Sequence, residues 1–355
     1  MTTFFGGMTM KIGTALASAA IITLAMTSVA HAHHSSSTYD VEQSVSIEGA
    51  VTRVLWVNPH VFIYIDQTTE DGVVRNWAVE GVNPAGLRRV GWSRDTLELG
   101  DIISVSGNPS KNMTSPGIYP QSITHAGIKL FDEQEFFAGV FAVEEAAVGT
   151  SSLVGVWKNP LTPAVIIPRE AIMDYQPGVG LHEVTQAGLE ALTQFDELTM
   201  NPAINCVEVS APLIMHFGDN KQLFIENDVI RIISEYDGGE RVIHLGIDTH
   251  DGAEYSNQGH SIGKLEGNTL EIDTTHFSKN NFGNGFGIPS SPQKHLFERL
   301  TLSDDGKSIS YHFSLTDPIY LSAPMSLDTS WAYQPDGEVV VDECNIESAR
   351  RFLEN

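Results

Sequence analysis

The sequence predicts a mainly β protein, with an OB-like barrel followed by a larger antiparallel β-barrel domain that carries one or two helices. Runs rich in β-branched residues recur from residue 45 onward, and Asp-Gly and Gly-Asn turns separate several of them. Between residues 45 and 130 these runs follow the order of three strands, a helix and two strands. That order is typical of an OB-like barrel.

Residues 1–32 have the layout of a cleavable secretory signal. One positive charge, Lys11, precedes the apolar run of residues 12–30, and the small residues Ala30 and Ala32 suit signal peptidase. Cleavage after Ala32 would make His33 the first residue of the mature chain. The alternative is a retained membrane anchor, because about 20 apolar residues span a bilayer. We expect export, which predicts a periplasmic or secreted protein without membrane insertion after cleavage.

The composition narrows the class of partner. The formal net charge of −25 repels phosphate backbones and anionic headgroups. We therefore expect neither nucleic acid nor a membrane surface as a partner, and we take the acidity as a determinant of solubility. The oligomeric state does not follow from these features.

The chain has two cysteines, Cys206 and Cys344. In an oxidising exported compartment an even pair predicts a disulfide bond rather than a metal site or a catalytic thiol. Such a bond would tie the last strand to the start of its own domain. Two unpaired thiols in the core are the alternative.

The first domain is expected over residues 33–130. Asn83-Pro84 supplies a cap and a first-turn proline, so residues 83–92 are predicted to form a short helix. Its strand candidates are residues 45–57, 61–66, 73–80, 102–107 and 123–130. A small sheet sandwich would give a similar string of elements. The acidic, small-residue-rich stretch of residues 131–150 is predicted to be a linker.

The second domain is expected over residues 151–355. Its opening, Gly155-Val156-Trp157, is similar to the lipocalin-type opening, in which the tryptophan closes the base of the barrel. Residues 181–195 have the apolar spacing of a helix. Its strand candidates are residues 223–226, 229–236, 241–245, 269–273, 295–302, 308–315, 326–333 and 338–342. This pattern predicts a lipocalin-like antiparallel barrel.

A series of short motifs in the first domain resembles a family of exported bacterial domains of unknown function, DUF6152. The motifs are His33-His34-Ser35, Tyr39-Asp40, Gly49, Trp56-Val57-Asn58-Pro59-His60, Trp77, Gly86-Leu87, Gly91-Trp92 and Gly100-Asp101. The resemblance covers about residues 33–130 and implies export and a domain boundary. The chain from Gly155 to Cys344 resembles an uncharacterised region of related exported proteins. Neither resemblance implies an activity.

The mature N-terminus is a candidate metal site. A free amine on His33 would offer two nitrogen ligands from one residue, and His34 and His60 are further imidazoles of the same domain. Nitrogen ligands in tetragonal geometry suit Cu(II), so copper is a possible cofactor. The alternative is that His33 and His34 form a mobile tip, and that His60 caps a turn after Asn58-Pro59.

Two glycine-rich motifs are weaker candidates. Residues 259–263, Gly-His-Ser-Ile-Gly, match the nucleophile elbow of serine hydrolases, but a turn and a strand follow where an elbow requires a helix. Residues 283–287 lack the Lys-Ser/Thr of a phosphate-binding loop. We expect this second motif to be a flexible loop, or a lid, over the barrel mouth, with Phe282 and Phe286 as apolar contacts.

Histidines and carboxylates gather in the second domain. The set is His244, Asp248, His250, His260, Asp273, His276, His295, Glu298 and Arg299. If the turns that carry His250 and His260 meet at the barrel mouth, they could act as general acid and base on a ligand bound in the barrel, together with Asp273 and Glu298. The alternative is that these residues are ordinary strand positions and surface pairs.

The leading hypothesis is an exported protein that binds a small, largely apolar molecule in its second barrel. Its enzyme version is cofactor-independent acid–base chemistry, as in an isomerase, lyase or hydratase, with His250, His260, Asp273 and Glu298 handling protons. A periplasmic copper-binding protein that uses His33 comes second. A structural or assembly protein without a ligand comes third.

Overall fold

The computed structural model describes residues 38–140, 146–159, 183–285 and 287–354. The predicted signal and the predicted ligands His33 and His34 lie outside these ranges. No helix within them is long and apolar enough to cross a membrane.

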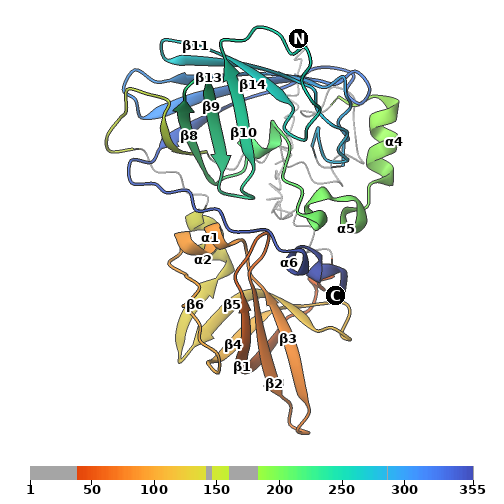
Figure 1. Cartoon of the computed structure of the whole chain (residues 1–355). Coiled ribbons are helices and arrows are strands. Elements are labelled where there is room, and N and C mark those ends of the chain that lie inside the picture. The colour runs from red at the N-terminus through yellow and green to blue at the C-terminus, as the bar shows by residue number, and fades with distance from the viewer. Residues whose placement is uncertain (1–37, 141–145, 160–182, 286, 355) are drawn as a thin grey trace, which may run out of the picture. The chain divides into compact units, whose positions relative to one another are not determined.

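Strands β1 (Val45–Leu55), β2 (Phe62–Thr68), β3 (Val74–Glu80), β4 (Ile102–Pro109) and β5 (Gly117–His125) form a closed barrel. They are hydrogen-bonded in the order β3-β2-β1-β4-β5, and a parallel pairing of β3 with β5 closes the ring. Figure 1 shows these strands forming one barrel, with helices α1 (Pro84–Arg89) and α2 (Glu133–Val140) at one end. The predicted OB-like barrel is confirmed.

Helix α1 (Pro84–Arg89) lies between β3 and β4, as predicted. The Asn83 side chain accepts a hydrogen bond from the backbone N–H of Gly86 at 2.9 Å, and Pro84 occupies the first turn, where its missing N–H needs no partner. The helix buries Leu87 in a core that also contains Trp56, Trp77 and Trp92. Local cap chemistry therefore places this helix over the barrel end.

The predicted strand over residues 123–130 is wrong, because a turn interrupts it and strand β5 already begins at Gly117. Strands β5 and β6 (Ile128–Asp132) form a hairpin in which His125 pairs with Ile128. The two residues between them, Ala126 and Gly127, have φ values of 50° and 78°. Two positive φ values are typical of a two-residue hairpin turn, for which Asn-Gly is preferred. Alanine gives no turn signal, so the sequence pattern predicts one continuous strand.

This turn gives a stability prediction. Ala126 is exposed and its backbone is strained by the positive φ, so Ala126→Asn should raise the free energy of unfolding by about 0.5–1 kcal/mol. The matched change Gly127→Ala should lower it by a similar amount, because an added Cβ there would meet no atom within 4 Å and only the backbone conformation penalises it. Urea denaturation of both variants measures this, and a lower stability for Ala126→Asn would contradict it.

The first part of the predicted linker is structured. Helix α2 (Glu133–Val140) follows β6 directly, and Phe131 and Phe136 are both buried, with ring centroids 5.5 Å apart. Both rings belong to the core of the first barrel. Residues 131–140 are therefore part of that barrel. The burial of the aromatic side chains in this segment outweighs the acidic composition that predicted a linker.

The second barrel is closed by nine strands, in the order β10-β11-β12-β13-β14-β15-β7-β8-β9. The strands are β7 (Gly155–Lys158), β8 (Asn220–Glu226), β9 (Val229–Ser234), β10 (Glu240–Leu245), β11 (His260–Glu266), β12 (Thr269–Thr275), β13 (His295–Leu302), β14 (Ser308–Thr316) and β15 (Met325–Tyr333). Neighbours pair antiparallel except β10 and β11, which pair parallel. The predicted mainly antiparallel barrel is confirmed, with this one exception.

The predicted opening of the second barrel lies in β7. Trp157 is fully buried, and its ring lies 5.0 Å from that of Tyr333. Helix α4 (Gln186–Gln194) falls within the predicted helix of residues 181–195, and Thr185 caps it by accepting a hydrogen bond from the Gly188 N–H at 3.1 Å. The remaining short helices are α5 (Glu197–Met200), η3 (Pro202–Asn205), η4 (Leu213–Met215), α6 (Ile346–Arg350) and η5 (Arg351–Glu354).

The segment after β15 differs from the prediction. Residues 338–342 form no strand, and Cys344 forms a disulfide with Cys206, with 5.8 Å between the Cα atoms. The expected bond is present, but it does not start from the last strand. Asn58 instead holds this segment, since its backbone N–H donates to the Glu343 carbonyl at 3.0 Å and its side chain donates to the Asp342 carbonyl at 2.8 Å.

Candidate functional site

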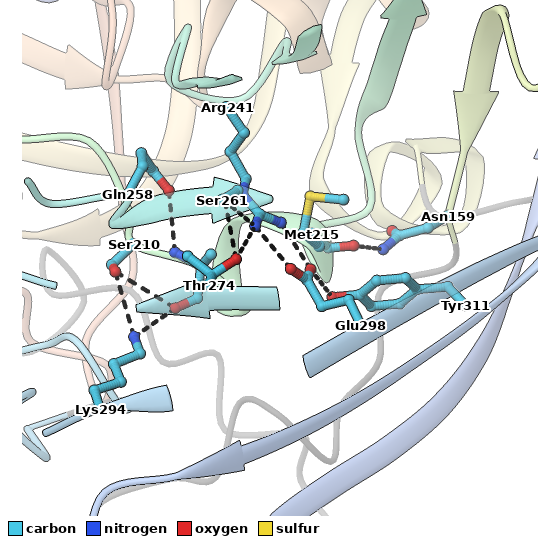
Figure 2. A network of polar contacts seen from close by, with 11 residues as sticks. Asn159, Ser210, Met215, Arg241, Gln258, Ser261, Thr274, Lys294, Glu298 and Tyr311 are labelled. Carbon is cyan, nitrogen blue, oxygen red and sulfur yellow. Dashed lines mark hydrogen bonds and ion pairs between the residues drawn. The ribbon is translucent and has the colours of Figure 1, made fainter. Parts of the chain in front are cut away.

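A buried ion pair lies inside the second barrel. Both terminal nitrogens of Arg241, on β10, donate to the carboxylate of Glu298, on β13, each at 2.7 Å. Their side chains are 1% and 0% exposed. Strand alternation explains the placement, because Arg241 and Glu298 take inward positions next to Ile243, Leu296 and Leu300. Figure 2 shows the two side chains meeting across the barrel interior.

Hydroxyl groups complete this pair. The Tyr311 hydroxyl, on β14, donates to Glu298 Oε1 at 2.7 Å, and Ser261 and Thr274 each lie 3.3 Å from Arg241 Nη2. Burial, and after it the charge of Glu298, raise the pKa of Tyr311 well above its usual value. Tyr311 therefore stays a donor. The pair is the centre of a hydrogen-bonded network drawn from five neighbouring strands.

Beside this network lie buried polar atoms without a hydrogen-bond partner in the described structure: both ring nitrogens of His216, Nε1 of Trp331, Oδ1 of Asn159 and Nε of Arg241. They are close to one another, since the His216 ring lies 5.3 Å from Tyr311 and Tyr311 stacks on Trp331 at 5.1 Å. Asn159 lies in the same region, because its side-chain amide donates a hydrogen bond to the backbone carbonyl of Met215, the residue before His216. Burial lowers the pKa of His216 to about 3, so its ring is neutral.

A buried lysine fixes the glycine-rich segment. The Lys294 ammonium donates to the carbonyls of Ala211 and Gly283, each at 2.5 Å, and lies 4.1 Å from the centre of the Phe277 ring. Asn284 is 1% exposed and donates to Asp317 at 2.8 Å. The predicted flexible loop or lid is therefore wrong for the part described, because residues 282–285 are buried. Phe282 does make the predicted apolar contact, with its ring 6.1 Å from that of Phe195. Phe286 lies outside the described residues.

On the outer side of the barrel the structure brings together three of the four predicted catalytic residues. Nδ1 of His250 lies 2.8 Å from Nδ1 of His260, and Nε2 of His250 lies 2.9 Å from Asp273 Oδ1. The other oxygen of Asp273 lies 2.7 Å from Nε2 of His295. His260, Asp273 and His295 occupy outward positions of β11, β12 and β13, and the long connection from β10 to β11 carries His250 onto them.

The hydrogen bonds assign the protons in this chain of groups. The hydrogen bond from His295, followed by that from His250, lowers the pKa of Asp273, which is therefore an ionised acceptor. His250 then carries its proton on Nε2 and accepts at Nδ1 from His260. Burial, and then the neighbouring His250, lower the pKa of His260. In its neutral form His260 is left with Nε2 as its free basic nitrogen.

Glu298 does not join these residues. Asp273 pairs with Phe297 in the β12–β13 ladder, so Glu298, one position further, points to the opposite face. Glu298 lies inside the barrel and Asp273 outside it, which separates the predicted four-residue site into two. Arg299 is also outside, where it pairs with Glu271 at 2.7 Å.

The Gly-His-Ser-Ile-Gly motif is not a nucleophile elbow. Residues 260–263 belong to strand β11, and the Ser261 hydroxyl lies 2.9 Å from the Thr274 hydroxyl in the barrel interior. This position agrees with the expectation from the sequence, in which a turn and a strand follow the motif where a nucleophile elbow requires a helix.

Of the predicted metal ligands only His60 is described. Its Nδ1 lies 3.2 Å from the Gly81 carbonyl and 3.3 Å from Glu80 Oε1, and its backbone N–H donates to Ser348. Within the described ranges no group of three or more His, Cys, Asp or Glu side chains is placed to hold a metal ion. The copper site at His33 stays a prediction.

Several residues of the interior network were not predicted. Arg241 shares the inward face of β10 with the aliphatic Ile243, and a charged residue alternating with a buried aliphatic one was the available signal. Tyr311, Trp331 and His216 gave no signal, because an aromatic residue in a strand or turn is compatible with ordinary core packing.

Comparison with known proteins finds one family model that matches in the region of the first barrel. Residues 20–119 match the model described as "Family of unknown function (DUF6152)". The first barrel is thus a DUF6152-like domain, in agreement with the motifs. No curated protein matches. One chain of the structure "Crystal structure of S. pombe Stn1-ten1 complex" is 12% identical, with a TM-score of 0.18, and the alignment covers 27% of this chain and 64%, less than two thirds, of that chain.

Proposed function

We propose that this chain, whose first barrel is a DUF6152-like domain, is an exported protein that binds a small, largely apolar molecule inside its second barrel. The observation that carries the proposal is the group of unpartnered polar atoms on His216, Trp331 and Asn159. Each such atom destabilises the folded state by about 1–3 kcal/mol when it is buried without a partner. A molecule that supplies the missing partners accounts for their presence.

The unpartnered atoms define the chemistry of the ligand. A neutral imidazole has one donor and one acceptor nitrogen, Trp331 adds a donor and the Asn159 carbonyl oxygen adds an acceptor. The charge of Arg241 is matched by Glu298, and that of the buried Lys221 by Asp219. The buried Lys294 donates to two backbone carbonyls instead, and burial lowers its pKa to about 7. We therefore infer an uncharged ligand that carries both a donor and an acceptor, such as a hydroxyl beside a carbonyl, on an apolar body. Leu223, Ile232 and Phe313 supply apolar surroundings in the same core.

Export is supported by the sequence of residues 1–32 and by the Cys206–Cys344 disulfide, since disulfides persist in oxidising compartments. Isomerase, lyase or hydratase chemistry stays a prediction that depends on the identity of the ligand. In the interior the Tyr311 hydroxyl donates a hydrogen bond to Glu298 Oε1 at 2.7 Å, which places a carboxylate and a phenol side by side.

Native mass spectrometry of the mature protein from its exported fraction tests the proposal. We expect the wild type to retain a small organic mass and His216→Leu to lose it. The same substitution should leave the ligand-free protein as stable or about 1 kcal/mol more stable, because it removes two unpartnered buried nitrogens. The control is His312→Leu on the outer face of β14, which should retain the mass.

Two results would contradict the proposal. One is a wild type without any bound mass after isolation from that fraction. The other is a His216→Leu protein that keeps the wild-type mass, because the unpartnered ring would then not contact the ligand.

A further inference from the structure

Two histidines of the second barrel face each other through ring nitrogens, away from the interior network. His250 and His260 have their Nδ1 atoms 2.8 Å apart, and the planes of the two rings are inclined by 80°. His250 lies in the connection between β10 and β11, and His260 is the first residue of β11. This pair is independent of the proposed ligand in the barrel interior, because it lies on the outer side.

We propose that Nδ1 of His250 and Nδ1 of His260 bind a divalent copper ion. Two ligand atoms about 2.0 Å from a metal ion and at right angles to each other lie about 2.8 Å apart, whereas tetrahedral ligands lie about 3.3 Å apart. The observed separation of 2.8 Å matches the right-angled case. Tetragonal nitrogen coordination is typical of Cu(II), which also binds nitrogen ligands more tightly than the other divalent first-row metals.

The groups behind His250 support a metal ligand. Metal-bound histidines usually donate their other ring N–H to a carboxylate, a backbone carbonyl or water, which orients the ring and raises its basicity. His250 has this arrangement through Asp273 Oδ1 at 2.9 Å, and His295 holds the second oxygen of Asp273 at 2.7 Å. Binding requires no change at His250, whose Nδ1 already lacks a proton, and His260 needs only to move its proton from Nδ1 to Nε2.

Two further imidazole rings lie near the pair, which is partly open to solvent. The ring of His276 lies 6.0 Å from that of His250 and 6.4 Å from that of His260, and the ring of His244 stacks on His260 at 5.0 Å. The His250 side chain is 18% exposed and Asp273 is 45% exposed. The pair therefore supplies two nitrogens to the ion and leaves its other positions to water or to a small ligand from solution.

Titration calorimetry with Cu²⁺ tests this site on the metal-free mature protein. His33→Ala and His34→Ala are present in every sample, so that the predicted N-terminal ligands do not contribute. We expect one Cu²⁺ per chain. His250→Gln should weaken binding at least about 100-fold, and Asp273→Asn about 10–100-fold, since it removes the orienting carboxylate. The control is His312→Gln, which breaks an outer-face His–Asp pair that lacks a second imidazole and should leave binding unchanged.

Electron paramagnetic resonance is measured on the copper-loaded protein that keeps His250. Its result therefore does not depend on whether the His250 variant folds. We expect nitrogen hyperfine structure from two imidazoles. Equal Cu²⁺ affinity in the His250→Gln and His312→Gln proteins, or a copper spectrum without nitrogen coupling, would overturn the proposal and leave His250 and His260 as a hydrogen-bonded pair. Neither result bears on ligand binding in the barrel interior, which mass spectrometry measures separately.

Discussion

Removal of one partner from the buried Arg241–Glu298 pair should lower the free energy of unfolding by about 3–5 kcal/mol. The expected loss is large because each residue is 1% exposed or less, so the remaining charge has no access to water. Glu298→Leu would also leave the Tyr311 hydroxyl without its acceptor. Urea denaturation followed by tryptophan fluorescence measures the change, since Trp331 stacks on Tyr311.

The double variant Arg241→Met, Glu298→Leu separates charge burial from packing. An apolar replacement of both partners leaves no unpaired charge, so we expect it to recover most of the loss caused by either single change. The neighbouring pair Arg299–Glu271 is the matched control, because Arg299 is next to Glu298 in sequence but 50% exposed. Arg299→Met should change the stability by less than about 1 kcal/mol. Similar losses for Arg241→Met and Arg299→Met would refute the assignment of a buried pair.

The first barrel could be predicted because its signals are local. β-branched runs mark its strands, and Asn83-Pro84 marks the start of α1. Its errors lie where the local sequence carries no such signal. Ala126 occupies a turn position without turn chemistry, and the buried Phe136 belongs to a segment whose composition resembles a linker. Such errors arise where tertiary packing, not propensity, decides the conformation.

The second barrel was predicted in outline but not in its connections. Strand β11 was missed, because residues 260–266 mix glycine and charged residues with only two aliphatic side chains. Its parallel pairing with β10 depends on a long connection whose path no local pattern specifies. The segment at residues 338–342 has strand-like composition but meets no strand partner.

The candidate site was predicted only in part, because the pairing between strands is not visible in the sequence. Alternation along β13 places His295 and Glu298 on opposite faces, yet which of them meets Asp273 depends on the register between β12 and β13. The ion pair joins residues 57 positions apart in sequence, so its partners could not be matched before the barrel order was known. A sequence shows which residues can take part in chemistry, whereas the pairing between strands decides which of these residues lie together.

Loss of the Cys206–Cys344 disulfide should also lower the stability strongly. The bond closes a segment of 138 residues, for which chain entropy alone predicts about 5 kcal/mol as an upper value. We expect the double variant Cys206→Ser, Cys344→Ser to lose about 3–5 kcal/mol in urea denaturation, and the wild type in a reducing agent to lose the same amount. An unchanged midpoint under reduction would contradict this.

Hydrogen bonds beside the disulfide also hold the C-terminal segment in place. Asp342 accepts hydrogen bonds from Arg88 at 2.5 Å and from Arg94 at 2.9 Å, and the Ser348 hydroxyl donates to the His60 carbonyl at 2.7 Å. These bonds join the C-terminal segment to the first barrel without any strand pairing beyond a single bridge. Asp342→Asn in the reduced protein should therefore destabilise it further than in the oxidised protein, because the covalent bond no longer keeps the segment near its partners. Equal effects of Asp342→Asn in both states would mean that the hydrogen bonds hold the segment independently of the disulfide.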